Sequence, residues 1–403
     1  MEEFLRLACL DYRGWDPAGA DEAERILARD PAIAQTGIHA AAAAGEVAAA
    51  TARLDAQPEL LDAPGRPHGW VPLLYACYSR VKSAGSGRST LAVARLLLSR
   101  GADPDAGFLL DHEVPPFTAL TGAFGNGEDG SRQPPHPDAL ALARLLLEAG
   151  ADPNDGQALY NRHFHENDDH LRLLLAYGLG RERKGRWARQ LGDRLECPAQ
   201  LLTEELWSAA RKNFLGRVKL LVAHGTNLDA KSRRDGRTPY EAALRAGNLQ
   251  IAELLLEHGA LRTEPAPEER FAAACLAGRR EEVMRLLAQQ PTLLDALGFH
   301  GRVELLHRAV EGNHPEGLRL MSALGFEISG MTTHDGVGVN LLATPLHNAA
   351  WLGNLELVNL LLELGADPRV QEPTYGATPL GWAEHNGQVA VVDLLKRFHK
   401  TIS

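Results

Sequence analysis

The sequence predicts an all-α fold, a solenoid of stacked helix-turn-helix units, and two observations lead to this. First, one pattern returns along most of the 403 residues. It reads TPLHNAAWLGNLELVNLLLELGADP from Thr344 and TPLGWAEHNGQVAVVDLLKRF from Thr378, so the two threonines are 34 residues apart. Second, each copy carries an apolar stripe that it cannot bury alone, whereas neighbouring copies in a stack can cover one another.

Each copy predicts two helices joined by a tight turn. In the clearest copy, Thr344 supplies an N-cap oxygen, and the proline after it has the φ angle of a first helical residue. Ala349 and Ala350 are small enough for the next helix to approach closely, and Gly353 ends the first helix. The leucine-rich stretch that follows has helical spacing and forms the stripe that needs a neighbour.

The TPLH, AA..G and LLL..GADP elements together resemble the ankyrin repeat, and the match covers about ten units from residue 31 to the C-terminus. The resemblance implies antiparallel helix pairs joined by hairpin-like fingers. It also implies a non-enzymatic role in protein-protein interaction, with the partner held on the concave face that the first helices and the fingers form. His39, His307 and His347 match the TPLH histidine, for which the resemblance implies a structural hydrogen bond.

Departures from the pattern define four segments. Residues 1–30 lack it and contain two short helical stretches, suited to an N-terminal helical cap. Residues 31–180 form an N-terminal array with loop insertions near 82–89 and 125–137, the second rich in Gly and Pro and therefore expected to protrude. Residues 181–202 form a basic insertion, and 203–403 form a C-terminal array with a longer finger at 329–341.

Composition limits the class of protein. With 45% apolar and 23% charged residues, the chain is composed like a globular protein, and a net charge of -10 disfavours nucleic acid as partner. Neither an export signal nor an apolar run of membrane-spanning length is present. The cysteines Cys9, Cys77, Cys197 and Cys275 lack metal or redox spacing. We therefore expect a cytoplasmic monomer without cofactor, metal or membrane association.

The stretch NRHFHENDDH, residues 161–170, has the composition of a metal or acid/base centre. Aligned on its leucine-rich ending, this unit places Arg162 and His163 at the two alanine positions, with the turn between the helices following them. His163 and His165 would then point about 200° apart on a helix. We expect a degenerate repeat with Asp168 or Asp169 at the start of its second helix. The alternative is an enzyme or a small-ligand or metal site around Tyr160, Arg162, His163, His165 and His170.

The outward positions of the first helices form a candidate contact strip. Aromatic and Arg side chains anchor many interfaces, and on this basis we expect the following residues to bind the partner: Tyr75, Tyr78, Arg162, Phe164, Arg211, Lys212, Arg245, Arg308, Trp351 and Trp382. Between residues 181 and 245, 15 Lys and Arg stand against 8 Asp and Glu, which suits an acidic partner. The sequence lacks a phosphate loop, a GxSxG elbow and an HExxH motif, so no catalytic residue is expected.

Overall fold

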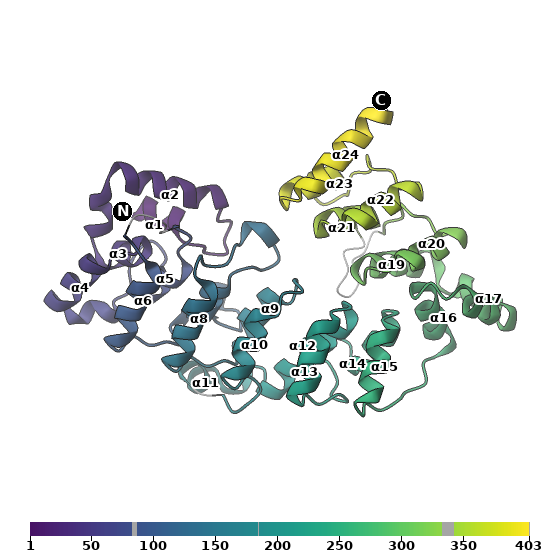
Figure 1. Ribbon diagram of the computed structural model, residues 1–403, viewed down its shortest axis with the longest axis horizontal. Helices are drawn as coiled ribbons and strands as arrows, with labels where there is room; N and C mark the ends of the chain where they lie inside the picture. The colour runs from purple at the N-terminus through teal and green to yellow at the C-terminus, as the bar shows by residue number, and fades with distance from the viewer. Residues whose placement is uncertain (83–86, 184, 333–341, 403) are drawn as a thin grey trace. The chain divides into compact units, whose positions relative to one another are not determined.

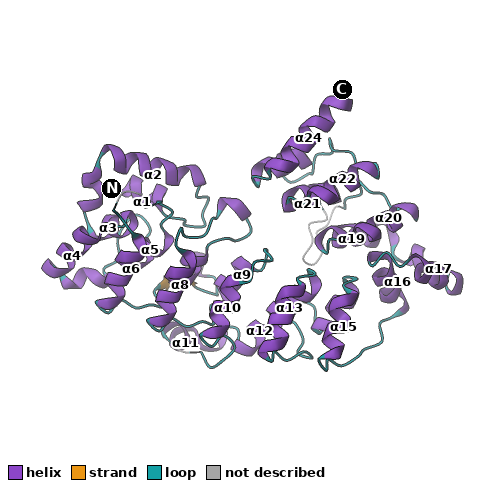
Figure 2. Ribbon diagram, viewed as in Figure 1, coloured by secondary structure: helices purple, strands orange, loops and turns teal. Residues whose placement is uncertain are grey.

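The computed structural model describes residues 1–82, 87–183, 185–332 and 342–402. Figure 2 shows helices joined by loops, with one small strand pair. The chain divides into two compact units, residues 1–202 and 203–403. Residues 83–86 of the expected insertion near 82–89 and residues 333–341 of the expected finger at 329–341 lie outside the described residues.

In the first unit, two N-terminal helices are followed along the chain by stacked helix pairs (Figure 1). Strands β1 (Gly107–Phe108) and β2 (Phe117–Thr118) pair antiparallel and form a short finger. The helices of this unit are α1 (Glu2–Ala8), α2 (Pro17–Arg29), α3 (Ile38–Ala44), α4 (Val47–Ala56), α5 (Pro72–Tyr78), α6 (Thr90–Ser99), α7 (Ala119–Phe124), α8 (Ala139–Glu148), α9 (Gly156–Arg162), α10 (Asp169–Ala176) and α11 (Arg186–Leu191). Short 3-10 turns cover Pro31–Gln35, Pro58–Asp62, Leu110–His112, Gly130–Arg132 and Gly192–Arg194.

The second unit continues the same arrangement. The boundary at residue 203 falls inside α12 (Pro198–Arg211). After it come α13 (Leu215–His224), α14 (Pro239–Arg245), α15 (Leu249–Glu257), α16 (Pro267–Leu276), α17 (Arg280–Gln289), α18 (Leu293–Ala296), α19 (Gly298–Glu311), α20 (Pro315–Ala323), α21 (Pro345–Leu352), α22 (Leu355–Glu363), α23 (Pro379–His385) and α24 (Val389–Ile402). A continuous apolar core runs from Phe271 of α16 to Leu395 of α24, made of the stripes that single pairs cannot bury.

Thr-Pro starts the first helices as the sequence predicts. Thr238 accepts a hydrogen bond from the amide of Glu241, and the Glu241 carboxylate accepts one from the amide of Thr238 at 2.9 Å. Thr344 forms the equivalent capping box with His347. Two of the otherwise unpaired amides at each helix start are thereby satisfied.

The turn after each first helix of the second unit contains a left-handed residue. Gly247 has a φ of +75°, and an added Cβ there would lie 2.5 Å from Cβ of Leu276 in the next helix pair. Asn213 and Asn313 take the same place, with φ of 63° and 54°. Asn tolerates this conformation better than most side chains, so repeats without the glycine keep the same turn.

The N-terminal segment covers more than the first repeat. The amide of Leu10 donates to the carbonyl of Tyr78 at 2.9 Å, and the Tyr12 ring lies 5.0 Å from Phe117 and 6.4 Å from Tyr78, centroid to centroid. The Asn161 side chain of α9 donates to the Tyr12 hydroxyl at 3.0 Å. Residues 9–12 thus lie against helices α5 and α9 and strand β2 of the first unit.

The expected protruding loop at 125–137 is partly packed instead. The Arg80 guanidinium donates to the carbonyl of Pro134 at 2.6 Å, and His136, only 2% exposed, lies 2.9 Å from the Thr90 hydroxyl. A Gly- and Pro-rich composition predicts the lack of a helix, but it does not show that polar groups of other helices hold the loop.

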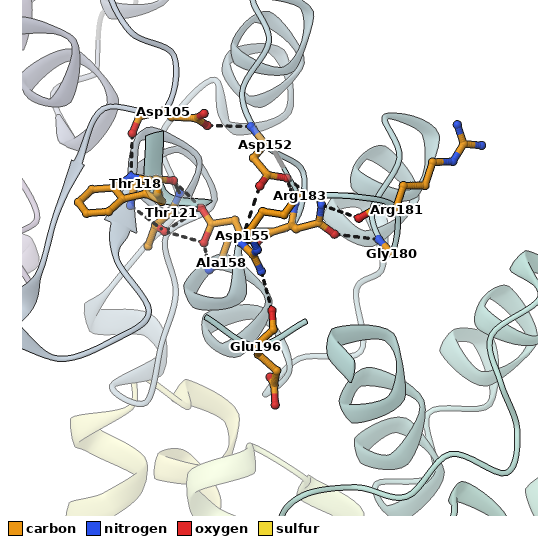
Figure 3. Close-up of polar contacts among 12 residues, drawn as sticks. Asp105, Thr118, Thr121, Asp152, Asp155, Ala158, Gly180, Arg181, Arg183 and Glu196 are labelled. Atoms are coloured by element: carbon orange, nitrogen blue, oxygen red, sulfur yellow. Dashed lines mark hydrogen bonds and ion pairs between the residues drawn. The ribbon is translucent and has the colours of Figure 1, made fainter. Parts of the chain in front are cut away.

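The basic insertion is likewise held by its own unit (Figure 3). Arg183 donates to the carbonyls of Asn154 at 2.6 Å and Glu196 at 2.9 Å. The Trp187 indole donates to the carbonyl of Asp105 at 2.9 Å. These contacts fix Arg183 and residues 185–196 against the connections before α7 and α9.

Candidate functional site

The first helices of the second unit share one register. Each of these helices is followed by a left-handed turn residue. On each helix, the residues two and five positions before that turn residue are three residues apart, so they lie on the same helix face. The first set is Arg211, Arg245, Leu276, Glu311, Trp351 and His385, and the second is Ser208, Ala242, Ala273, Arg308, Asn348 and Trp382. We call this face the inner face of the second unit.

Four basic residues of the predicted contact strip come together on the inner face. Arg211 lies 3.3 Å from the Glu311 carboxylate, and Arg245 lies 3.4 Å from that of Glu304. Arg308 forms an ion pair with the same Glu304 carboxylate. Lys212 follows Arg211, and the charge of Glu311 acts on it. We call these six residues the inner-face cluster: Arg211, Lys212, Arg245, Arg308, Glu304 and Glu311.

The inner-face cluster brings four basic groups and two carboxylates together. Burial, together with the neighbouring Arg211 charge, lowers the pKa of Lys212 to about 7. Burial also lowers the pKa of Arg308 to about 10, against the opposing effect of Glu304. Burial raises the pKa of Glu311, which the three nearby cations counteract. Keeping these side chains charged in this partly buried place therefore costs desolvation free energy.

The helices α12, α14 and α19 meet because their turns hydrogen-bond to one another. The Asn213 side chain, after α12, donates to the carbonyl of Gly312 at 3.0 Å. His314 lies 2.9 Å from the carbonyl of Ala246, after α14. These two contacts connect the turn after α19 to the turns of two earlier pairs, which brings Glu304 and Glu311 to the arginines.

A cavity of about 640 Å³ adjoins the cluster at Arg245. Tyr240 and Leu244 of α14 and Ala273 of α16 contribute its apolar wall. Several charged residues line the remainder, among them Arg237, which bonds Glu269 at 2.9 Å. Arg245 thus borders both the cluster and a space of the size that small ligands or side chains occupy.

Two predicted tryptophans form a second feature of the inner face. Trp351 of α21 and Trp382 of α23 lie 5.9 Å apart in a T-shaped arrangement, and His385 stacks on Trp351 at 5.8 Å. The Trp351 carbonyl accepts hydrogen bonds from Asn386 at 2.7 Å and from Gln388 at 3.0 Å. We call Trp351, Trp382 and His385 the aromatic ladder. The rings of Trp351 and Trp382 are partly exposed, and His385 is exposed.

The expectation that Tyr75 and Tyr78 face outward is wrong. Both have 0% exposure, because the N-terminal segment covers α5. The Tyr75 hydroxyl donates to the carbonyl of Gly65 at 2.8 Å, and that of Tyr78 donates to the carbonyl of Thr118 at 2.8 Å. The two rings are core residues of the first unit, and they do not form a contact surface.

The alignment of the fourth unit also needs correction. Asp155 caps α9 by accepting from the amide of Ala158 at 2.9 Å. Counted from this cap, the alanine positions fall on Tyr160 and Asn161, and Asn161 is 2% exposed. Arg162 instead takes the helix position of Trp351 and is partly exposed. The alignment failed because six residues connect α9 to α10, whereas the usual turn has two or three.

The remaining residues of the 161–170 stretch are dispersed. His163 and Phe164 lie in the connection after α9, with ring centroids 4.1 Å apart and with Tyr160 beside both. His170 is 1% exposed in α10, against the ring of Phe124 at 6.0 Å. Asp168 and Asp169 start α10, as predicted. Among the described residues, no three His, Cys, Asp or Glu side chains are arranged to hold a metal ion.

The TPLH histidines make the structural hydrogen bonds that the resemblance implies. His39 lies 2.8 Å from the carbonyl of Ala63, and His307 lies 2.7 Å from the side chain of Asn348. His347 lies 2.8 Å from the Thr344 hydroxyl and 3.1 Å from the carbonyl of Ala377. Burial lowers the pKa of all three, so these imidazoles are neutral at pH 7.

Sequence reasoning did not identify Glu304 and Glu311 as part of the site. Glu311 occupies the register position of Trp351, and this could have been found by aligning Asn313 with Gly353. Glu304 has no such signal, because its contact with Arg245 depends on how α19 meets α14. None of the helices in the described part of the chain has the length and hydrophobicity that a membrane span requires.

Known proteins contain repeats that are similar to those of this chain. The model of the ankyrin-repeat family in three copies matches residues 197–266 and 306–402, and the single-repeat model matches residues 68–107. The chain is 30% identical over 216 residues to human palmitoyltransferase ZDHHC13, covering 47% of this chain and 29% of that protein. It is 30% identical over 155 residues to the ankyrin repeat protein nuc-2 of Neurospora crassa, covering 37% of this chain and 13% of that protein.

A third relative is the ankyrin repeat and KH domain-containing protein mask-1 of Caenorhabditis elegans, 29% identical over 201 residues, which are 48% of this chain and 7% of that protein. The aligned region therefore spans less than a third of the length of each of these relatives.

Proposed function

Because the chain belongs to the ankyrin-repeat family, we propose that it is a non-enzymatic scaffold that holds a partner protein or peptide on the inner face of its second unit. Ankyrin repeats are in general protein-protein interaction modules, and this general role applies here. The palmitoyltransferase relatives match over 29% of their length, so their activity is not carried over to this chain.

The observation that carries the proposal is the common register of the inner face. Arg211, Arg245 and Trp351 occupy the same position on three of the first helices, and Arg308 and Trp382 share the other position. Arginine and tryptophan are the side chains most enriched among interface residues that dominate binding energy. In the first unit, the N-terminal segment already lies on the corresponding helices.

The partner segment that fits this face is acidic, with at least one apolar or aromatic side chain. The guanidinium groups of the inner-face cluster can bind carboxylates, and the aromatic ladder offers flat apolar surface. The proposal does not use the insertion at 181–202, because the contacts of Arg183 and Trp187 hold it against its own unit.

Peptide display on the purified full chain tests the proposal. We expect selection of peptides that combine acidic and aromatic residues, and loss of their binding in the variant Trp351→Ala/Trp382→Ala. Phe299→Ala, at a site that is 52% exposed at the start of α19, is the matched control and should bind like the wild type. Selected peptides that bind the double variant as tightly as the wild type would place the binding site elsewhere.

We further place the protein in the cytoplasm as a monomer. Cys9, Cys77 and Cys275 are buried free thiols, and Cys197 is an exposed one, which suits a reducing compartment. Cell fractionation and light scattering of the purified chain test the two parts of this proposal separately.

A further inference from the structure

The connection between α15 and α16 is shorter than those before α14 and α23. Residues 226–238 before α14 and residues 366–378 before α23 number 13 each, whereas residues 260–266 before α16 number seven. The helix α16 begins directly after them, at Pro267. Six fewer residues are therefore left here to form a finger.

The two longer connections each close a hydrogen-bonded turn. In the connection before α14, the amide of Ser232 donates to the carbonyl of Arg237 at 2.9 Å. In the connection before α23, the amide of Glu372 donates to the carbonyl of Ala377 at 3.0 Å. Residues 260–266 are all described, and no backbone hydrogen bond joins two of them. The finger of this repeat is therefore missing.

The cavity of about 640 Å³ lies between the finger before α14 and the short connection. Its lining combines residues of 231–237 in that finger with residues 262–265 and with parts of α14 and α16. The Glu204 carboxylate accepts hydrogen bonds from the Ser232 hydroxyl and the Arg233 amide, both at 2.7 Å. The finger that forms one wall is thus held in place. We call this cavity the finger gap.

Three groups in the lining of the finger gap have no hydrogen-bond or ion-pair partner among the described residues. They are the Tyr240 hydroxyl, the Arg262 guanidinium and the Glu264 carboxylate. The Tyr240 side chain is only 3% exposed, whereas Arg262 and Glu264 are exposed. Burial raises the pKa of Tyr240, and the charges of Arg262 and Glu264 act on it in opposite directions, so the three groups are close together. The finger gap therefore offers a donor, an acceptor and a hydroxyl that can be both.

These groups match a peptide backbone better than a small ion. An anion at this place is repelled by Glu264, and a cation is repelled by Arg262. A peptide group is neutral and has one donor and one acceptor, so it can satisfy both side chains at once. The Tyr240 ring and Leu244 add apolar surface against which a side chain of the same segment can pack.

We propose that the finger gap binds a tight turn of the partner polypeptide, which takes the place of the missing finger. This inference rests on the proposed function, because the finger gap borders the inner face at Arg245, and it adds the conformation that the partner presents there. A segment already closed into a turn has little conformational freedom to lose, which favours its binding over that of a linear segment.

Selection from two peptide libraries on the purified full chain tests the proposal. One library contains short peptides that a thioether bond closes into a ring, and the other contains the same sequences in linear form. We expect the closed library to yield binders. Their linear forms should bind about tenfold more weakly or worse, because they lose more conformational entropy on binding.

The variant Ala273→Trp tests where the closed peptides bind. Ala273 lines the finger gap and is 8% exposed, so an indole at this position fills the space and should abolish binding. Ala288→Trp, at an exposed position of α17 outside the lining, is the matched control and should bind like the wild type. Circular dichroism and thermal unfolding show whether both variants fold.

Tyr240→Phe removes only the hydroxyl and replaces Ala273→Trp if that variant fails to fold. It should weaken the binding of closed peptides about two- to tenfold, the loss expected for one neutral hydrogen bond.

The proposal is overturned if no closed peptide is selected, if the linear forms bind as tightly, or if Ala273→Trp and Ala288→Trp bind the selected peptides equally. Failure of the proposed function gives a different result, because the displayed acidic and aromatic peptides would then not depend on Trp351 and Trp382. The variant Trp351→Ala/Trp382→Ala should still bind the closed peptides. Loss of the closed peptides alone, with the displayed ones retained, would reject only the finger gap.

Discussion

The guanidinium of Arg245 lies 3.4 Å from the carboxylate of Glu304, although 59 residues separate them. Arg245 ends α14, Glu304 lies within α19, and the helix pair of α16 and α17 comes between them in the chain. The same carboxylate holds Arg308. Glu304 is thus the residue that connects the basic groups of two non-consecutive first helices.

Replacing Glu304 by Gln should lower the free energy of unfolding by about 1–2 kcal/mol, because two guanidiniums that are only partly exposed lose their shared charge partner. Glu316→Gln is the control, since Glu316 is 72% exposed, and it should change stability by less than about 0.5 kcal/mol. Urea unfolding measures both. Equal effects of the two variants would show that Glu304 does not organise the cluster.

Lys212→Met should alter how stability depends on pH. Burial lowers the pKa of Lys212 from 10.5 to about 7 in the folded chain. Between these values the unfolded chain binds more protons, so this residue makes stability rise with pH through that window. The variant should be more stable than the wild type at pH 6 to 7 and should lack this rise.

Thermal unfolding across pH 6 to 10 measures the effect of Lys212→Met. Lys219→Met, at an exposed position of α13, serves as control and should follow the wild-type curve. A Lys212→Met curve parallel to that of the wild type would contradict the burial of this ammonium group.

Comparing Gly247→Ala with Gly259→Ala separates the cost of backbone strain from the cost of a packing clash. Both glycines have positive φ, +75° and +96°, so both substitutions add strain of about 1–2 kcal/mol. Only at Gly247 would the new Cβ meet another side chain, that of Leu276 at 2.5 Å, whereas nothing lies within 4 Å at Gly259. Gly247→Ala should therefore cost about 1–3 kcal/mol more in unfolding free energy. Similar losses would mean that the next helix pair moves away easily.

Trp187→Ala should release the basic insertion from the first unit. The indole loses its hydrogen bond to the Asp105 carbonyl, and residues 185–196 should exchange amide hydrogen faster as local opening becomes easier. Hydrogen-exchange mass spectrometry measures this change. Arg189→Gln, an exposed residue of the same helix, is the control and should leave exchange unchanged. Protection that survives in Trp187→Ala would show that the contacts of Arg183 and Arg186 suffice to hold the insertion.

Much of the architecture follows from local chemistry and could be predicted. Thr238 and Thr344 start helices because their hydroxyls satisfy amides a few residues away. Gly353 ends α21 because its φ of +71° suits glycine. The same reasoning predicted that Asp168 and Asp169 start α10. It also identified Arg211, Lys212, Arg245 and Arg308 as outward residues of first helices, although it could not show that they meet.

One error concerns a contact between segments distant in the chain, and the other concerns the length of a connection between two helices. Tyr75 occupies the helix position of an inner-face residue, yet residues from the N-terminal segment cover its helix. Arg162 was misplaced because the length of the connection after α9 could not be read from the leucine-rich ending. In both cases the local pattern was identified correctly and the neighbouring segment was not.

The amino-acid sequence by itself determined the repeat, the start and end of most helices, and the structural histidines, because these depend on hydrogen bonds and backbone angles within a few residues. The tertiary structure decided which inner-face positions remain accessible and which charges meet. Glu304 reaches Arg245 only through the packing of α19 against earlier turns, and such packing depends on the summed shapes of several helices, which no short stretch of sequence contains.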